Sequence, residues 1–243
     1  MRLISLLIGL FFTLSAFGQD SRMRELNELI NENDPGWPIV KGWISNATNH
    51  VEVLPKDNTR ADSALYQSQV TTRSPMGAVI YETGGILVES GWIRILGSGS
   101  DELNRSIMDW NKGKSFSEIG NPPSFLLIAD DVLGGFYAIN GGGIESKNIG
   151  KVYYFAPDTL TWENTGLGYS DFLIFCFQGD LQEFYKGLRW DNWVDDVSAL
   201  DGNQGIFCYP YLWSEEGKDI NKVRRKPVPV QELWDFYIAN THK

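Results

Sequence analysis

The stretch "SFLLIADDVLGGFYAINGGGIESKNIGKVYYFAPDTLTWENTG", residues 124–166, decides the fold class of this chain. It holds three short apolar runs rich in aromatic and β-branched residues, "SFLLIAD", "GGFYAIN" and "KVYYFAP". Such runs, bounded by glycine and asparagine, are typical of strands joined by turns. The triplet Gly141–Gly143 is followed neither by Gly-Lys-Ser/Thr nor by a helix start, so it does not match a phosphate-binding loop. We therefore predict three strands, with the glycines in the turns between them.

Working outward, the same reading predicts strands and helices on both sides of this stretch. Further strands are expected at 50–55, 77–83, 85–90, 91–96 and 205–213. Apolar residues at helical spacing, with caps and breakers, predict helices at 21–33, from Pro38 to Trp43, at 58–69, from Ser100 to Gly113, from Ser170 to 178, at 181–188, at 190–200 and at 229–239. Helices and strands occur in clusters instead of strict alternation, which indicates an α+β fold. We expect a mixed, largely antiparallel sheet with helices packed on it, forming a single domain over residues 19–243.

The N-terminus has the three regions of a secretory signal peptide. Met1-Arg2 is a short positive start, Leu3 to Leu14 is almost purely apolar, and small residues end the run by Gly18. The apolar run is shorter than the roughly 20 residues that a membrane-spanning helix needs, although an uncleaved anchor is the alternative. We predict a signal peptide over residues 1–18, no integral membrane segment after its cleavage, and a periplasmic or secreted protein.

Charge and composition exclude several classes of partner and chemistry. The chain has 21 Lys and Arg against 31 Asp and Glu, a net charge of −10, which disfavours nucleic acid as a partner. It has only two histidines, His50 and His242, so a zinc site or a Ser-His-Asp triad is not expected. We predict no metal, no cofactor and no catalytic residues.

The two cysteines, Cys176 and Cys208, leave two alternatives open. An oxidising compartment permits one disulfide between them. Both also lie in apolar runs, where a free cysteine behaves as a small buried hydrophobe.

Two kinds of residue are candidates for a binding surface. Asp130 and Asp131 precede a glycine turn and could bind a ligand there, although a pair of solvated turn carboxylates is the more ordinary explanation for them. Trp162, Trp190 and Trp193 lie beside polar residues, as aromatic residues at protein interfaces often do, although half-buried rim positions have the same pattern. A carboxylate-dependent glycan hydrolase is the alternative, since Asp158, Glu163 and Asp191 also lie near tryptophans and paired carboxylates perform that chemistry.

Long runs of the sequence resemble a known bacterial family. "DPGWPIVKGWISNATNHVEVLP", "QVTTRSPMGAVIYETGGILVESGWIRILGSG" and "GDLQEFYKGLRWDNW" are similar to members of the domain of unknown function 2625 family, over nearly the whole mature chain. That family has no assigned activity, so this resemblance implies no function.

A second, weaker resemblance is to the SUKH superfamily, which groups yeast cell-wall-assembly regulators with bacterial immunity proteins. The matching positions are Asp130, Asp131, Gly134, Gly135, Val152, Tyr153, Tyr154, Ser170 and Phe172. The turn "DDVLGG" is longer than the usual form, and a signal peptide is unusual for an immunity protein. The resemblance implies a SUKH-like core that grips a toxin or client protein.

Three functions are therefore expected in order. The first is a non-catalytic, extracytoplasmic, protein-binding module whose partner is a toxin or an envelope component. The second is the secreted glycan hydrolase, and the third is a chiefly structural envelope protein.

Overall fold

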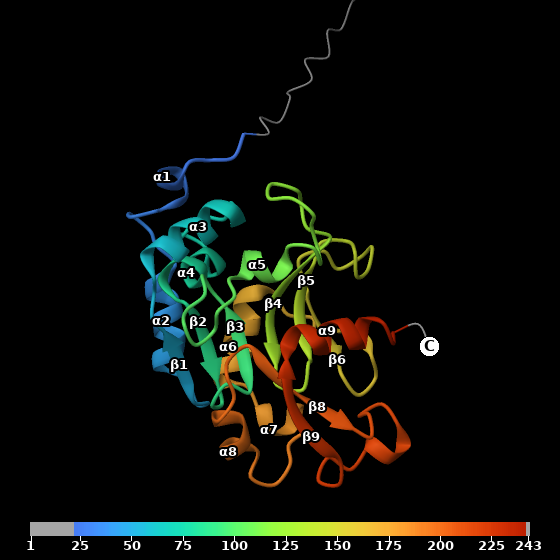
Figure 1. Ribbon diagram of the computed structural model, residues 1–243. Helices are drawn as coiled ribbons and strands as arrows, with labels where there is room; N and C mark the ends of the chain where they lie inside the picture. Colours follow the sequence, from blue (N-terminus) through green and yellow to red (C-terminus); the bar gives the residue numbers. More distant parts are fainter. Residues whose placement is uncertain (1–21, 242–243) are drawn as a thin grey trace, which may run out of the picture.

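The computed structural model describes residues 22–241, and its centre is a seven-stranded antiparallel sheet (Figure 1). Each strand pairs with the next one along the chain, so the sheet is a simple meander. The strands are β1 (Val51–Leu54), β2 (Gly85–Val88), β3 (Ile93–Leu96), β4 (Phe125–Asp131), β5 (Phe136–Asn140), β6 (Val152–Ala156) and β7 (Thr161–Asn164). The three strands predicted within residues 124–166 are β4, β5 and β6, and their glycines lie in the turns between them.

Helices cover one face of this sheet. The group comprises α1 (Leu26–Leu29), α2 (Trp37–Ser45), α3 (Asn58–Ser68), α4 (Pro75–Glu82) and α6 (Tyr169–Gln178). On β5, Tyr137 packs against Phe172 of α6, with ring centroids 4.9 Å apart. The carbonyl of Phe177 accepts hydrogen bonds from the Thr48 and Asn49 N–H groups, which fixes the end of α6 beside the start of β1.

Over β4–β6, the opposite face is covered by the last part of the chain and by α5 (Ile107–Asn111). A two-stranded sheet, β8 (Gln204–Tyr209) with β9 (Arg224–Pro229), leads into α9 (Val230–Ile238). Trp234 of α9 meets Phe136 of β5 edge to face at 5.0 Å, and the Ile206 N–H donates to the Val132 carbonyl at 2.6 Å. Figure 1 draws α9 and β8–β9 in front of the sheet and α6 behind it.

The architecture confirms the predicted α+β fold. The predicted helices at 58–69 and 229–239, and the strands at 50–55, 85–90, 91–96 and 205–213, correspond to observed elements within a few residues. The helix predicted at 21–33 is much shorter, since α1 covers four residues. The predicted signal peptide over residues 1–18 lies outside the described residues.

One predicted strand is wrong. Residues 77–83, "GAVIYET", lie mostly in helix α4, which starts after Ser74, whose hydroxyl accepts from the Gly77 N–H at 3.0 Å. Pro75 occupies the first turn, where its missing N–H costs nothing. The cap and the proline outweigh the β-like apolar run, because α4 packs against α2, α3 and α6 and is buried on several sides.

Two predicted helix caps are displaced. Ser106, instead of Ser100, caps α5 by accepting from the Asp109 N–H at 3.0 Å, while Ser100 closes an upstream turn. Helix α6 begins after Gly168 and not at Ser170. The predicted helices at 181–188 and 190–200 are confirmed as the short α7 (Leu181–Phe184) and α8 (Trp193–Ser198).

Strand β9 was not predicted. Its sequence "RRKPVP" combines three basic residues with two prolines, which argues against a central strand. It is an edge strand of a two-stranded sheet, where prolines are tolerated because the missing N–H faces outward.

Both cysteines are free and buried, which resolves the open alternative in favour of buried thiols. Burial raises the pKa of the Cys208 thiol to about 12. Within residues 22–241, no helix has the length and apolar character needed to cross a bilayer.

Candidate functional site

One row of directly paired residues runs across all seven strands on the face that α9 and β8–β9 partly cover. In strand order the row reads Glu52, Leu87, Arg94, Asp130, Phe136, Phe155 and Trp162. Directly paired residues of an antiparallel sheet lie on the same face. The row therefore changes from polar and charged at β1–β4 to aromatic at β5–β7.

The aromatic end of the row is closed. Phe136 and Phe155 are fully buried, and Trp234 of α9 lies against Phe136. Trp162 is half-buried and packs edge to face on Phe155 at 5.3 Å.

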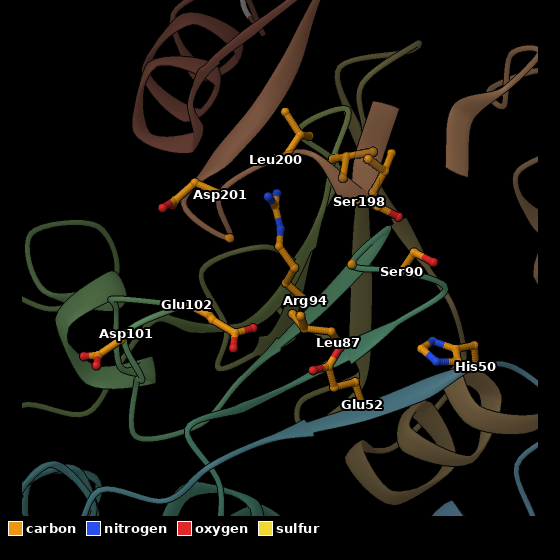
Figure 2. A pocket seen from close by; sticks show the side chains of 14 residues that line it. His50, Glu52, Leu87, Ser90, Arg94, Asp101, Glu102, Ser198, Leu200 and Asp201 are labelled. Carbon is orange, nitrogen blue, oxygen red and sulfur yellow. The ribbon is translucent and has the colours of Figure 1, made fainter. Parts of the chain in front are cut away.

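Above the polar end of the row lies a hollow of about 510 Å³, within the range of ligand sites in proteins. Its floor is formed by β1–β3, and its walls by the segments around Asp101 and Asp201 and by the end of α8. Figure 2 shows Arg94 standing up from β3 toward Leu200, with Glu52 on β1 and His50 just before that strand. We call this site the acidic hollow, since its lining includes the four carboxylates Glu52, Asp101, Glu102 and Asp201.

Arg94 lines the acidic hollow, but it is buried and shares one carboxylate, that of Asp130, with Arg105. Its Nε donates to Asp130 Oδ1 at 2.6 Å, and Arg105 Nη1 donates to Asp130 Oδ2 at 2.5 Å. Asp130 is fully buried, and Arg94 and Arg105 are 2% and 8% exposed. Burial lowers the pKa of the Arg94 guanidinium, and Asp130 opposes that shift. Removing one partner from such a buried group is strongly destabilising, because the remaining charge has no compensation.

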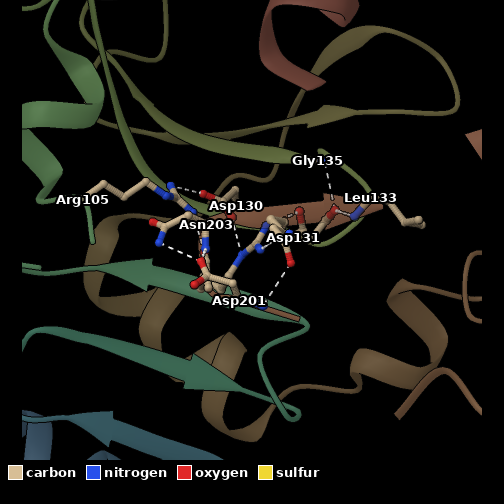
Figure 3. Close-up of polar contacts among 10 residues, drawn as sticks. Arg105, Asp130, Asp131, Leu133, Gly135, Asp201 and Asn203 are labelled. Carbon is tan, nitrogen blue, oxygen red and sulfur yellow. Dashed lines mark hydrogen bonds and ion pairs between the residues drawn. The ribbon is translucent and has the colours of Figure 1, made fainter. Parts of the chain in front are cut away.

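The same two arginines also bind backbone carbonyl groups in the segment after α8, which forms one wall of the acidic hollow. Arg94 also donates to the Gln204 carbonyl and, at 3.0 Å, to the Asp131 carbonyl, while Arg105 donates to the Gly202 carbonyl at 3.3 Å. Figure 3 shows Arg105 beside Asp130, and Asn203 donating to Asp201 at 2.8 Å. Asp130 therefore fixes the position of the segment that carries Asp201.

Asp131 lies on the opposite face of the sheet from its neighbour. Its carboxylate accepts from the Leu133 and Gly135 N–H groups at 2.9 Å and from the Tyr154 hydroxyl at 2.7 Å. A Cβ on Gly135 would lie 2.1 Å from Asp131 Oδ2, which explains the second glycine of "DDVLGG". Burial raises the pKa of Asp131, and its hydrogen bonds oppose that rise.

Trp190 and Trp193 lie behind the α8 wall. Both contact Trp92, which directly precedes β3, at ring distances of 5.7 and 5.0 Å. The guanidinium of Arg189 lies 4.2 Å from the Trp193 ring and pairs with Glu89 at 3.7 Å. This cluster anchors α8, whose Val197 and Ser198 line the acidic hollow.

The predicted binding residues therefore lie in four different settings. Asp130 lies beneath the acidic hollow, and Trp190 and Trp193 support its wall. Asp131 is on the other face, and Trp162 is at the far end of the sheet. Asp130, Asp131 and Trp190 are at most 2% exposed, so these three are not available for direct contact with a partner in this structure. Asp130 and Asp131 are also not the solvated turn pair that was their alternative.

Sequence reasoning missed Arg94 and the four carboxylates of the hollow. Arg94 had a usable signal, since a charged residue inside the apolar run "WIRIL" predicts a buried partner such as Asp130. Glu52, Asp101, Glu102 and Asp201 had none, because isolated acidic residues at these separations look like ordinary surface residues.

Neither the acidic hollow nor the core of the described chain contains a group of side chains that could bind a metal ion. No group of three or more His, Cys, Asp and Glu side chains within residues 22–241 is placed to hold a metal ion. His50 is the one histidine in that range, since His242 lies outside it.

Comparison with known proteins places the chain in a family. A family model described as "Protein of unknown function DUF2625" matches residues 26–233. The chain belongs to the DUF2625 family. This DUF2625 chain is 46% identical over 221 residues to an "Uncharacterized protein" of Haemophilus influenzae, covering 91% of this chain and 96% of that relative.

A second relative of the DUF2625 chain is the "Putative uncharacterized protein YbfG" of Escherichia coli K12. The two are 45% identical over 216 residues, or 88% of this chain and 95% of that relative. No solved structure matches the chain, so the likeness to the SUKH superfamily stays a prediction.

Proposed function

We propose that this DUF2625 protein is a non-catalytic binding module that acts outside the cytoplasm and holds a positively charged group of a protein partner in the acidic hollow. The observation that carries the proposal is the charge of that site. Glu52, Asp101, Glu102 and Asp201 line it, whereas its one lining arginine, Arg94, is buried and shares the carboxylate of Asp130 with Arg105. The four lining carboxylates therefore outweigh the one positive charge that this buried group retains.

The local charge selects the kind of partner. Asp101 is fully exposed and has one cationic neighbour, Arg60, at 3.4 Å, a pair that water weakens strongly. A lysine or arginine side chain entering the hollow gains complementary charge from several sides. A basic segment of a toxin or of an envelope component meets this requirement, and a nucleic acid does not.

The ionisable groups in and beneath the acidic hollow favour ligand binding over catalysis as its function. General acid–base catalysis needs a group whose pKa is adjusted and which faces the ligand. Among the described residues, the carboxyl with a raised pKa is that of Asp131, which lies on the other face of the sheet and already accepts three hydrogen bonds. The ion pairs beneath the hollow hold its walls, as a preorganised binding site requires.

Binding of arginine amide, a small cation without a free carboxylate, tests the proposal. Titration calorimetry at low ionic strength is expected to detect binding that weakens as salt is added. The triple change E52Q, E102Q and D201N is expected to weaken it by about tenfold or more. Removing three exposed acids outside the hollow, with E32Q, E118Q and E232Q, is the matched control and should change it little. Equal binding by both variants would contradict the proposal.

The location outside the cytoplasm is supported by the N-terminal sequence and has its own test. Expression of the full chain in a Gram-negative host, followed by fractionation and intact mass measurement, is expected to yield a periplasmic form starting at Gln19. A cytoplasmic protein that retains Met1 would contradict this part.

A second hollow favours the hydrolase as an alternative function. It measures about 490 Å³, lies beside β6 and β7, and brings Asp158 and Glu163 together with Phe184 and Trp213. Two carboxyls beside aromatic rings suit a glycan. Release of reducing ends from cell-wall or capsular glycans, lost in E163Q but kept in E102Q, would favour the hydrolase over the binding module.

A further inference from the structure

Strand β1 is an edge of the sheet, and it borders the acidic hollow. We propose that the partner's basic segment binds as an extended strand, which pairs antiparallel with the free edge of β1 and places alternate lysine or arginine side chains over the acidic hollow. This inference rests on the proposed function and adds the conformation and side-chain pattern of the ligand.

The backbone N–H and C=O groups of successive β1 residues point alternately toward β2 and away from it. The Glu89 N–H on the β2 side donates to the His50 carbonyl at 2.9 Å. Because hydrogen-bonded residues alternate in an antiparallel pair, His50, Glu52 and Leu54 direct their backbone groups toward β2. Val51 and Val53 therefore direct their N–H and C=O groups outward.

These outward groups are free to pair. In the part of the chain that the structure describes, neither Val51 nor Val53 forms a backbone hydrogen bond to any segment on the outer side of β1. Val53 is 37% exposed, and Val51 is half-buried. An edge with unpaired groups is a template for an added strand, and such addition is an established mode of peptide recognition.

The two faces of β1 define the side chains of the added strand. Glu52 faces the acidic hollow, so every second residue of the ligand lies on the acidic side, where Asp101, Glu102 and Asp201 also lie. The residues between them lie beside Val51 and Val53 on the other face. The expected ligand alternates basic and apolar residues.

The other edge of the sheet offers a contrast within the same molecule. Strand β7 is also exposed, but its residue in the cross-strand row is Trp162, which packs on Phe155. No acidic side chain occupies that row position on β7. A basic strand is therefore expected at β1 and not at β7.

The probe is an acetylated and amidated peptide, (Lys-Val)3, and two N-methylated forms of it. In antiparallel pairing, the valine N–H groups of the peptide point to β1 and the lysine N–H groups point away. N-methylation of the valines is expected to weaken binding about tenfold, since net hydrogen bonds of this kind are each worth a few-fold to tenfold in affinity. N-methylation of the lysines is the matched control and is expected to leave affinity nearly unchanged.

Residue-resolved amide hydrogen exchange by NMR gives the second readout. Saturating (Lys-Val)3 is expected to slow exchange of the Val51 and Val53 amides by about tenfold or more. The amides of Glu52 and Leu54, which already pair with β2, and those of β7 should change little. The variant V53P removes one outward N–H; it should weaken the peptide but not arginine amide.

The results of these experiments distinguish a failure of the strand-pairing inference from a failure of the proposed cation-binding function. Equal effects of the two methylation patterns, with no protection of Val51 and Val53, would overturn the strand pairing and leave the cation site standing. A loss with the lysine-methylated peptide alone would overturn the antiparallel orientation. No binding of either peptide or arginine amide would overturn both proposals. Protection of Val51 and Val53 that rises with protein concentration alone would assign the edge to a second copy of the chain and overturn a peptide ligand.

Discussion

The two ends of the cross-strand row differ in what covers them, and that difference separates the stable core from the candidate site. At β5–β7 the row presents Phe136, Phe155 and Trp162, and α9 closes over it through Trp234. At β1–β3 it presents Glu52, Leu87 and Arg94, and the same face opens into the acidic hollow. The comparison shows that one regular meander can support a packed core at one end and a binding surface at the other.

The largest effect is expected at Asp130, which joins the two ends of the row. D130N leaves Arg94 and Arg105 buried without the one carboxylate that they share, and should cost about 3–5 kcal/mol in free energy of unfolding. Urea denaturation followed by circular dichroism measures the change. D131N is the matched neighbour, because its amide can still accept from the backbone and donate to the Tyr154 oxygen. Equal losses for the two variants would contradict the assignment of Asp130 as the link.

The next largest loss of stability is expected when side chains at the two ends of the cross-strand row are truncated to alanine. F136A is expected to cost about 3 kcal/mol, since it leaves a cavity under Trp234. L87A, in the half-buried floor of the hollow, should cost less than about 1 kcal/mol. Thermal and urea denaturation of both variants check this, and a larger loss at Leu87 would mean that the hollow is part of the core.

The pH dependence of Asp131 gives a smaller effect with a definite sign. Because burial raises its pKa in the folded protein, the folded state binds the proton more tightly than the unfolded state. That contribution to stability is fully present below the unfolded pKa and is lost as the pH rises through the folded value. D131N removes this dependence, so its stability relative to the unmodified protein should rise as the pH increases from about 4 to 7. A relative stability that falls over this range would contradict the raised pKa.

The smallest effects on stability are expected in the acidic hollow itself. E102Q and D201N change side chains at a solvent-facing wall, and each should alter the free energy of unfolding by less than about 0.5 kcal/mol. Chemical denaturation measures this, in parallel with arginine amide binding. Unfolding of these variants would show that the carboxylates stabilise the fold instead of serving a ligand.

Much of the sheet could be predicted from local sequence, because the apolar runs and glycine turns at 124–166 form strands and turns through residues that are close together in the sequence. The helix α4 was mistaken for a strand, since its apolar run has no helical period and the helix depends on the Ser74 cap, on Pro75 and on packing between neighbouring helices. The acidic hollow depends on segments near residues 52, 102 and 201, which the fold brings together. Of the predicted binding residues, Asp130 was found next to the site because a carboxylate at the end of an apolar strand carries a signal of its own.

The most direct test of the central claim is a two-dimensional amide NMR titration with arginine amide. If the cation binds in the acidic hollow, the largest shifts will fall on residues 50–52, 87–94, 101–102 and 197–202, and β6 and β7 will change little. Shifts centred on Asp158 and Glu163, or none at all up to the solubility of the probe, would contradict a cation-binding site at the open end of the sheet.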